Sequence, residues 1–203
     1  MTYKKNGKWN ESFFISKKRF QEKGYNVTPI EGYNLKQHPE IKPNQVVYLN
    51  LRDKVIPYLN NKRYGDGILV AEDDAYVADF LTPSFLLTKL KENNHTESII
   101  KIGYQKVLKH PKSGYPRGYF CVGNQLIWFP RKQMSKLKSE LDKSKAQHLN
   151  GFLSKNMNLD IKLLDQERQK KNKYVFELEH ISTTTGKTRK GLKINKKTKK
   201  ANN

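Results

Sequence analysis

Three adjacent carboxylates, Glu72, Asp73 and Asp74, are the residues whose type and spacing point most directly to chemistry. They follow an apolar run at residues 68–71, which is typical of a strand buried on both faces. In open α/β sheets, ligands bind beyond the carboxyl ends of strands, and clustered carboxylates there suit a hard divalent cation. Such a cation can bridge a diphosphate and neutralise the charge that develops on a leaving phosphate.

The triplet also has a simpler interpretation, a solvated acidic turn. By itself, the triplet does not separate a sugar transferase from a phosphatase or a nuclease. A metal-dependent nuclease would need further acids and a lysine at defined strand spacing, and the sequence shows no such set.

The elements that must position these carboxylates read as alternating strands and helices. Strands are predicted at residues 13–15, 25–30, 68–71, 98–104, 119–129 with a break at 123–125, and 173–181. Helices are predicted at residues 17–23, 50–60, 83–92, 131–145 and 147–155. Gly24 would end the first helix, Pro57 would kink the second, and Thr82 would cap the third ahead of Pro83. This alternation predicts an α/β fold with a mostly parallel sheet covered by helices.

Positive charge dominates the composition. The 203 residues carry 40 Lys and Arg against 19 Asp and Glu, a formal charge of +21. Such an excess suits a polyanionic partner, namely nucleic acid, an anionic membrane surface or an acidic glycan. The alternative is compositional, because Lys and Asn have AT-rich codons. Residues 166–203 hold twelve Lys or Arg against three Glu, so we predict a domain at 1–165 and a basic C-terminal extension at 166–203 with a strand pair and a solvated tail.

Cysteine content and hydropathy bear on the compartment. Cys121 is the single cysteine, so no internal disulfide can form, which fits a reducing compartment. The first residues lack the apolar stretch of a signal peptide, and no apolar run approaches the ~20 residues of a membrane-spanning helix. We therefore expect a soluble, cytoplasmic protein, located in the host cytoplasm if the source is a virus.

The acidic triplet and its surroundings resemble glycosyltransferase family 25, which includes bacterial lipooligosaccharide and collagen galactosyltransferases. The family has an apolar strand ending in Leu-Glu-Asp-Asp, and residues 70–74 here read Val-Ala-Glu-Asp-Asp. Residues 14–19 are similar to the family's opening strand and the basic segment that contacts the donor nucleotide. Residues 123–129 are similar to a Gly-Tyr-hydrophobic strand. The chain departs from the family at Asn150, where members usually carry an acid, so no general base is carried over.

The resemblance implies a GT-A fold and a hexosyltransferase that uses a nucleotide sugar, a UDP-sugar above all, with Mn²⁺ or Mg²⁺. It implies Asp74 as principal metal ligand, Glu72 on the metal or the donor sugar, and Asp73 beside Asp74 in catalysis. His148 would complete the metal sphere, its alternative being an ordinary surface histidine. Further donor-binding candidates are Ser16, Lys17 and Arg19, otherwise a solvated helix face, and Asn124 and Gln125, otherwise a hairpin turn.

The acceptor is the least specified part of this hypothesis. The positive charge suggests a polyanion, for example a modified base in viral DNA, which would have to be flipped out of the duplex to react. A protein or glycan acceptor competes with it. A different class of function also stays open, a non-enzymatic viral protein that binds nucleic acid and in which the acidic triplet is a surface turn.

Overall fold

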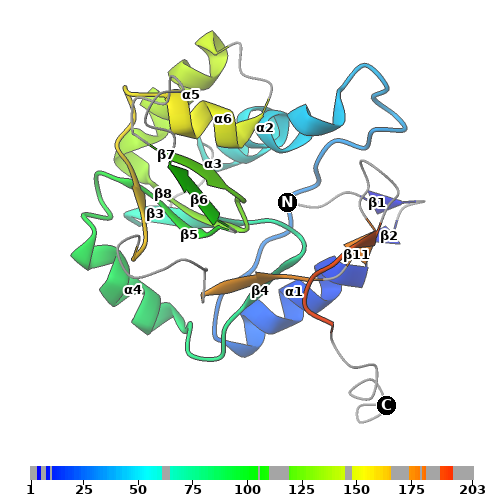
Figure 1. Cartoon of the computed structure of the whole chain (residues 1–203), viewed down its shortest axis with the longest axis horizontal. Helices are drawn as coiled ribbons and strands as arrows, with labels where there is room; N and C mark the ends of the chain where they lie inside the picture. The colour runs from blue at the N-terminus through cyan, green and yellow to red at the C-terminus, as the bar shows by residue number, and fades with distance from the viewer. Residues whose placement is uncertain are drawn as a thin grey trace.

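The computed structural model describes residues 4–5, 8–9, 11–60, 65–104, 106–109, 119–144, 148–165, 174–178, 180–181 and 188–193. The fold is mixed α/β, as predicted, with a central sheet between layers of helices (Figure 1). The sheet runs in the order β3 (Gly67–Ala71), β8 (Leu126–Pro130), β5 (Ile99–Gly103), β9 (Ile161–Leu163).

The strand directions make the sheet mixed, as expected from the resemblance, but not Rossmann-like and parallel. β8 is antiparallel to both of its neighbours, β3 and β5, whereas β9 is parallel to β5. β3, β5 and β9 therefore run the same way, with one reversed strand inserted between the first two. The sheet is mixed, and the prediction of a mostly parallel sheet is not confirmed.

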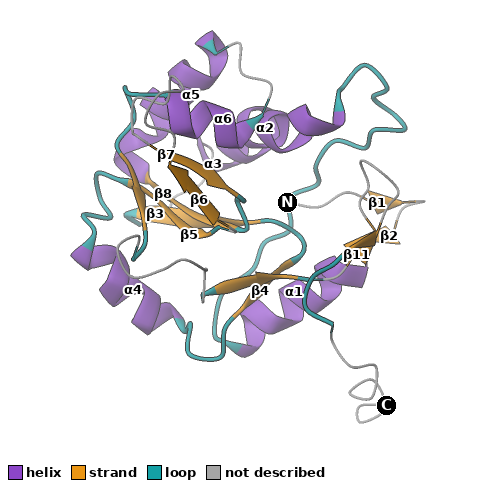
Figure 2. Ribbon diagram, viewed as in Figure 1, coloured by secondary structure: helices purple, strands orange, loops and turns teal. Residues whose placement is uncertain are grey.

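Successive side chains along the strands point to opposite faces of the sheet and pack into two hydrophobic cores, one on each face. On β8, Ile127 and Phe129 enter the first core, and Leu126 and Trp128 enter the second. The elements whose buried residues build the first core are α2 (Val46–Asn50), the π-helical turn η2 (Leu51–Val55), α3 (Ile56–Asn60), α5 (Met134–Lys143) and α6 (Leu149–Lys155). Those of the second are α1 (Glu11–Glu22), β4 (Ala75–Val77), α4 (Pro83–Glu92) and β10 (Val175–Glu177). Figure 2 shows these two groups on opposite sides of the sheet.

The remaining described elements are short. They are the 3₁₀ turns η1 (Pro43–Gln45) and η3 (Arg131–Gln133) and the strands β1 (Lys4–Lys5), β2 (Lys8–Trp9), β6 (Lys106–Lys109), β7 (Tyr119–Val122), β11 (His180–Ile181) and β12 (Thr188–Arg189). β1 with β2, β6 with β7, and β11 with β12 each pair antiparallel. No helix in the described part of the chain is long and apolar enough to cross a membrane.

Elements with strong local signals form where they were predicted. Thr82 accepts a hydrogen bond from the Phe85 backbone N–H at 3.3 Å, and Pro83 opens α4. The predicted strands around 98–104 and 119–129 appear as β5, β7 and β8, and the helices around 131–145 and 147–155 as α5 and α6. The helix predicted at 50–60 is part of a longer helical stretch. Its π turn comes just before Pro57, whose missing N–H cannot donate to the fourth carbonyl back.

Two predicted strands near the start of the chain are wrong. Residues 13–15 lie in α1, in which Phe13, Ser16 and Phe20 face inward at helical spacing while Phe14 is 54% exposed. Residues 25–30 form no strand. Instead, Gly24 adopts φ +88° and ends the helix as predicted, and the Tyr25 N–H donates to the Phe20 carbonyl at 3.0 Å.

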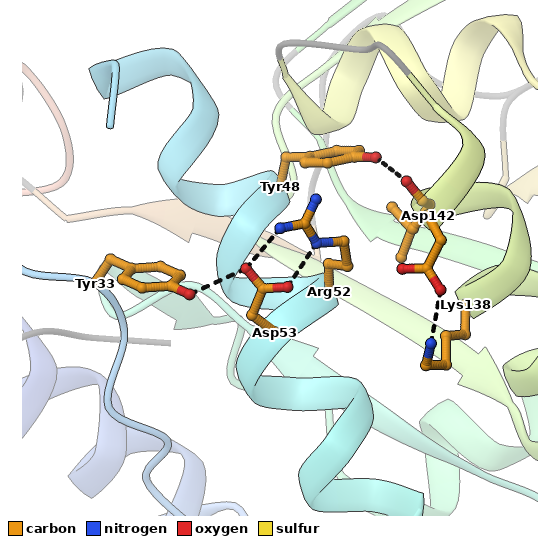
Figure 3. A network of polar contacts seen from close by, with 7 residues as sticks. Tyr33, Tyr48, Arg52, Asp53, Lys138 and Asp142 are labelled. Atoms are coloured by element: carbon orange, nitrogen blue, oxygen red, sulfur yellow. Dashed lines mark hydrogen bonds and ion pairs between the residues drawn. The ribbon is translucent and has the colours of Figure 1, made fainter. Parts of the chain in front are cut away.

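A polar network fixes the loop after α1 to the helical stretch of the first face (Figure 3). Asp53 accepts hydrogen bonds from the Tyr33 hydroxyl at 3.0 Å and from Arg52 Nε at 2.5 Å. The Tyr33 N–H donates to Asn50 Oδ1 at 2.8 Å. Farther along, the Tyr48 hydroxyl donates to the carbonyl of Leu141 at 2.5 Å and so ties α2 to α5.

The C-terminal region contributes to the second core. β10 pairs antiparallel with β4, and Tyr174, Val175 and Leu178 are buried. The strand predicted within 173–181 is therefore present as β10 and β11. Residues 174–178 pack in the same unit as the chain before residue 165, whereas the predicted solvated tail at 196–203 lies outside the described residues.

Candidate functional site

The acidic triplet forms the turn that carries the chain from the central sheet to the ribbon of β4 and β10. β3 ends at Ala71, and the Glu72 N–H continues the ladder by donating to the Gln125 carbonyl at 3.1 Å. The Ala75 N–H then donates back to the Glu72 carbonyl at 3.2 Å. From the far end of the chain, the Leu178 N–H donates to the Asp74 carbonyl at 2.8 Å. The backbone of the triplet is thus held on both sides.

These carboxylates are not a solvated turn. Asp74 is 5% exposed, and Glu72 and Asp73 are partly buried. The pKa of Glu72 is raised from 4.5 to about 8, first by burial and then by the neighbouring charges of Asp74 and Asp73, with a smaller contribution from Glu177. Glu72 therefore holds a proton at neutral pH unless a cation reaches the site. Sequence reasoning missed Glu177, which β10 brings in from the C-terminal region.

Two amide side chains add oxygen atoms beside the triplet. Asn124 and Gln125 lie in the turn between β7 and β8, where Gly123 has φ +92°, and both are buried. Gln125 stands opposite Glu72 in the ladder, so their side chains share one face of the sheet. Asn124 Oδ1 and Gln125 Oε1 accept no hydrogen bond from the described part of the chain. Both atoms are buried acceptors whose hydrogen-bonding capacity the described residues leave unused.

The predicted metal-ligand set is not assembled as a protein-only site. Among the described residues, no three His, Cys, Asp or Glu side chains group closely enough to hold an ion. The residues nevertheless fit a Mg²⁺ or Mn²⁺ ion that arrives with a nucleotide, because such ions take one or two carboxylates and complete their shell with phosphate oxygens and water. Asp74 and Glu72 supply hard oxygen donors of this kind.

His148 caps the helix that follows it, and its predicted metal ligation stays a prediction. Its Nδ1 accepts a hydrogen bond from the Gly151 N–H at 2.9 Å and so caps the start of α6. A Cβ on Gly151 would lie 2.4 Å from His148 Cε1, which accounts for the glycine. Nδ1 is therefore engaged at the helix terminus.

Ser16 and Arg19 were predicted to contact the donor. In the structure, both hydrogen-bond to the backbone of β4. The Ser16 hydroxyl donates to the Ala75 carbonyl at 2.6 Å. Arg19 donates from Nε to the Val77 carbonyl at 3.0 Å, pairs with Asp79, and lies 4.7 Å above the Tyr76 ring. Their polar groups therefore hold β4 directly after the triplet, a positioning role.

The other predicted donor-binding residue of α1 is Lys17. Its side chain is partly buried, and its proposed contact with a diphosphate stays a prediction.

A buried lysine was also missed. Lys101, in the middle of β5, is 1% exposed, and its Nζ donates to Asn150 Oδ1 of α6 at 3.2 Å. The signal was visible in the sequence as a lone lysine within Ile-Ile-Lys-Ile. Asn150 takes the place where the resembled family carries an acid, and here it supports this lysine.

Comparison of the chain with known protein families, with curated proteins and with solved structures found no match.

Proposed function

We propose that this chain is a metal-dependent glycosyltransferase that moves a sugar from a nucleotide-sugar donor to a hydroxyl acceptor. One observation carries the proposal: the partly buried Glu72 and the buried Asp74 directly follow the carboxyl end of β3, an edge strand of the sheet, and burial together with the neighbouring carboxylates raises the pKa of Glu72 to about 8. Carboxylates kept in mutual repulsion are destabilising unless they serve a ligand, and a divalent cation with a diphosphate is the ligand that relieves them.

In this mechanism, the protein binds the donor and the cation and orients the acceptor hydroxyl toward the donor sugar. Asp74 and Glu72 would hold the cation, which supplies neutralisation of the leaving diphosphate. Asn124 and Gln125 would accept hydrogen bonds from hydroxyls of the donor sugar. Asp73, the more exposed neighbour of Asp74, would take the proton from the acceptor hydroxyl.

The finer parts of the proposal rest on the resemblance to glycosyltransferase family 25. They are the GT-A arrangement, a UDP-sugar as donor, and Mn²⁺ or Mg²⁺ as the ion. The Glu-Asp-Asp turn directly after β3 supports this resemblance, whereas β3 lies at the edge of the sheet and the opening strand that contacts the nucleotide in the family is replaced by α1 here.

The composition favours a second candidate, a basic nucleic-acid-binding protein. The formal charge of +21 exceeds what binding a diphosphate requires. The same charge supports a polyanionic acceptor, including DNA, for the transferase. The two candidates differ in whether a nucleotide sugar stabilises the protein.

Thermal unfolding of the full chain with Mn²⁺ and a panel of nucleotide sugars tests the proposal. A matching donor at about 100 times its Kd should add roughly 2.7 kcal/mol of stability. For a chain of this size, that is a rise in Tm of about 5–10 °C.

Two variants make the test specific. Asp74→Asn should abolish the response. Asp142→Asn, which removes a carboxylate paired with Lys138 at 2.6 Å far from the triplet, should retain it. The proposal fails if no nucleotide sugar raises Tm, or if Asp74→Asn responds as the unmodified chain does. Salt-dependent DNA binding without any response to nucleotide sugars would favour the second candidate.

A further inference from the structure

A cleft of about 520 Å³ opens at the end of the sheet opposite the acidic triplet. β8 begins at Leu126 beside the triplet and ends at Pro130, after which Lys132 and Gln133 enter the cleft. Glu97 comes just before β5, and Asp160 just before β9. The lining residues are Glu97, Lys132, Gln133, Lys136, Met157, Asn158, Leu159 and Asp160. Its volume lies within the range of ~300–1,000 Å³ usual for small-molecule sites.

Gln133, one of the lining residues, carries a buried acceptor. The side chain is 9% exposed, and its Nε2 donates to the backbone carbonyl of Glu97 and, at 3.5 Å, to that of Asp160. These bonds fix the orientation of the amide. Its Oε1 is buried and accepts no hydrogen bond from the described residues. A buried amide oxygen without a donor keeps its full desolvation penalty, so the site suits a ligand that offers an O–H or N–H.

The walls mix donors and acceptors without a dominant charge. Lys132 pairs with Glu97, and Ser98 donates a hydrogen bond to the Asp160 carboxylate. Lys136 and Asn158 add an ammonium and an amide at the rim. Met157, 58% exposed, provides the one large exposed apolar side chain of the lining.

We infer that this cleft binds a carbohydrate. Sugar hydroxyls donate and accept at once, which matches the acceptor Gln133 Oε1 together with the lysine and amide donors. The C–H face of a sugar ring can cover Met157. Phosphate is mainly an acceptor and would face the carboxylates of Glu97 and Asp160. A nucleobase would find no aromatic ring among the lining residues to stack on.

The inference does not depend on the proposed glycosyl transfer, because the cleft and the triplet lie at opposite ends of β8. If the chain does transfer sugars, the cleft would hold a remote part of an oligosaccharide acceptor, away from the reacting unit. A long glycan would then be anchored at one end of the sheet and modified at the other.

Titration of the ¹⁵N-labelled full chain with lactose and with maltotriose, in EDTA and without nucleotide, tests the cleft separately from the donor site. We expect saturable shifts of the Glu97, Gln133 and Asn158 signals for at least one of the two sugars. Gln133→Met and Asn158→Ala should each weaken binding at least tenfold. Ser135→Ala, an exposed change on α5 next to the lining residue Lys136 but outside the lining, should leave binding unchanged.

The inference is overturned if neither sugar gives saturable shifts at these residues. It is also overturned if sodium phosphate produces the same shifts, or if both variants bind as the unmodified chain does. Asn158→Ala decides the matter should Gln133→Met fail to fold, since Asn158 is exposed at the lip of the cleft. Either result leaves the Mn²⁺ and nucleotide-sugar test of the acidic triplet unaffected.

Discussion

Replacing Glu72 by glutamine should make the metal-free protein more stable at alkaline pH. The substitution keeps the size and hydrogen-bonding capacity of the protonated acid but cannot ionise. In the folded protein the pKa of Glu72 is raised from 4.5 to about 8, first by burial and then by Asp74 and Asp73. The folded state therefore binds a proton that the unfolded chain has lost, and stability falls as pH rises from about 4.5 to 8.

The size of this effect follows from the shift itself. Raising the pKa from 4.5 to about 8 corresponds to about 5 kcal/mol if nothing around Glu72 relaxes. Water entry and side-chain movement reduce such penalties, so we expect about 2–3 kcal/mol at pH 9. For a chain of about 200 residues, this is a rise in Tm of roughly 4–12 °C. The two proteins should converge below about pH 4.5, where Glu72 is protonated in both the folded and the unfolded state.

Thermal unfolding in EDTA at pH 5 and pH 9 measures the difference. Mn²⁺ should reverse the order at pH 9, because only the ionised carboxylate gains from the cation. Glu22→Gln is the matched control: it removes an exposed carboxylate on α1 that faces Lys18 at 3.9 Å, and it should leave Tm unchanged at both pH values. A Glu72→Gln protein that is equally or less stable at pH 9 would refute the reasoning about mutual repulsion in the triplet.

Three further predictions concern the parts that hold the site together. Ser16→Ala should cost about 1–3 kcal/mol in urea unfolding, because it leaves the Ala75 carbonyl without its buried donor. Asp53→Asn should destabilise the protein above pH 4. Burial alone would raise the pKa of Asp53, but the hydrogen bonds from Arg52 and Tyr33 outweigh burial, and the pKa is lowered. Its stabilisation is present above the unfolded pKa of 3.8 and is lost as pH falls through the folded value, so urea midpoints of variant and parent should meet at low pH. Truncation after Asp165 should abolish cooperative thermal unfolding, because it removes β10 and exposes the second core; an intact sharp transition would contradict this.

Local signals were sufficient for several elements. α4 has Thr82 and Pro83 at its start, and β8 is a run of apolar residues bounded by polar ones. The first helix was misread because residues 13–15 are too few to separate a strand from a helix. Its inward face also includes Ser16, whose burial depends on a hydrogen bond to a carbonyl 59 residues away.

Non-local pairing set the limits of prediction. The position of β8 between β3 and β5 depends on contacts between segments that are distant in sequence, and no local pattern encodes it. The triplet could be predicted as a candidate site because its residues are adjacent. Glu177 could not be predicted as part of the site, because only the pairing of β10 with β4 brings it near Glu72.

The partnership of β4 and β10 also sets an order of events during synthesis. Ala75 and Val77 leave the ribosome about a hundred residues before Val175 does. Until the last fifth of the chain has been translated, β4 has an unpaired edge, and such edges recruit other chains. A chain that stops before β10 would therefore expose the edge of β4 and lack the hydrogen bond from Leu178 to the acidic turn.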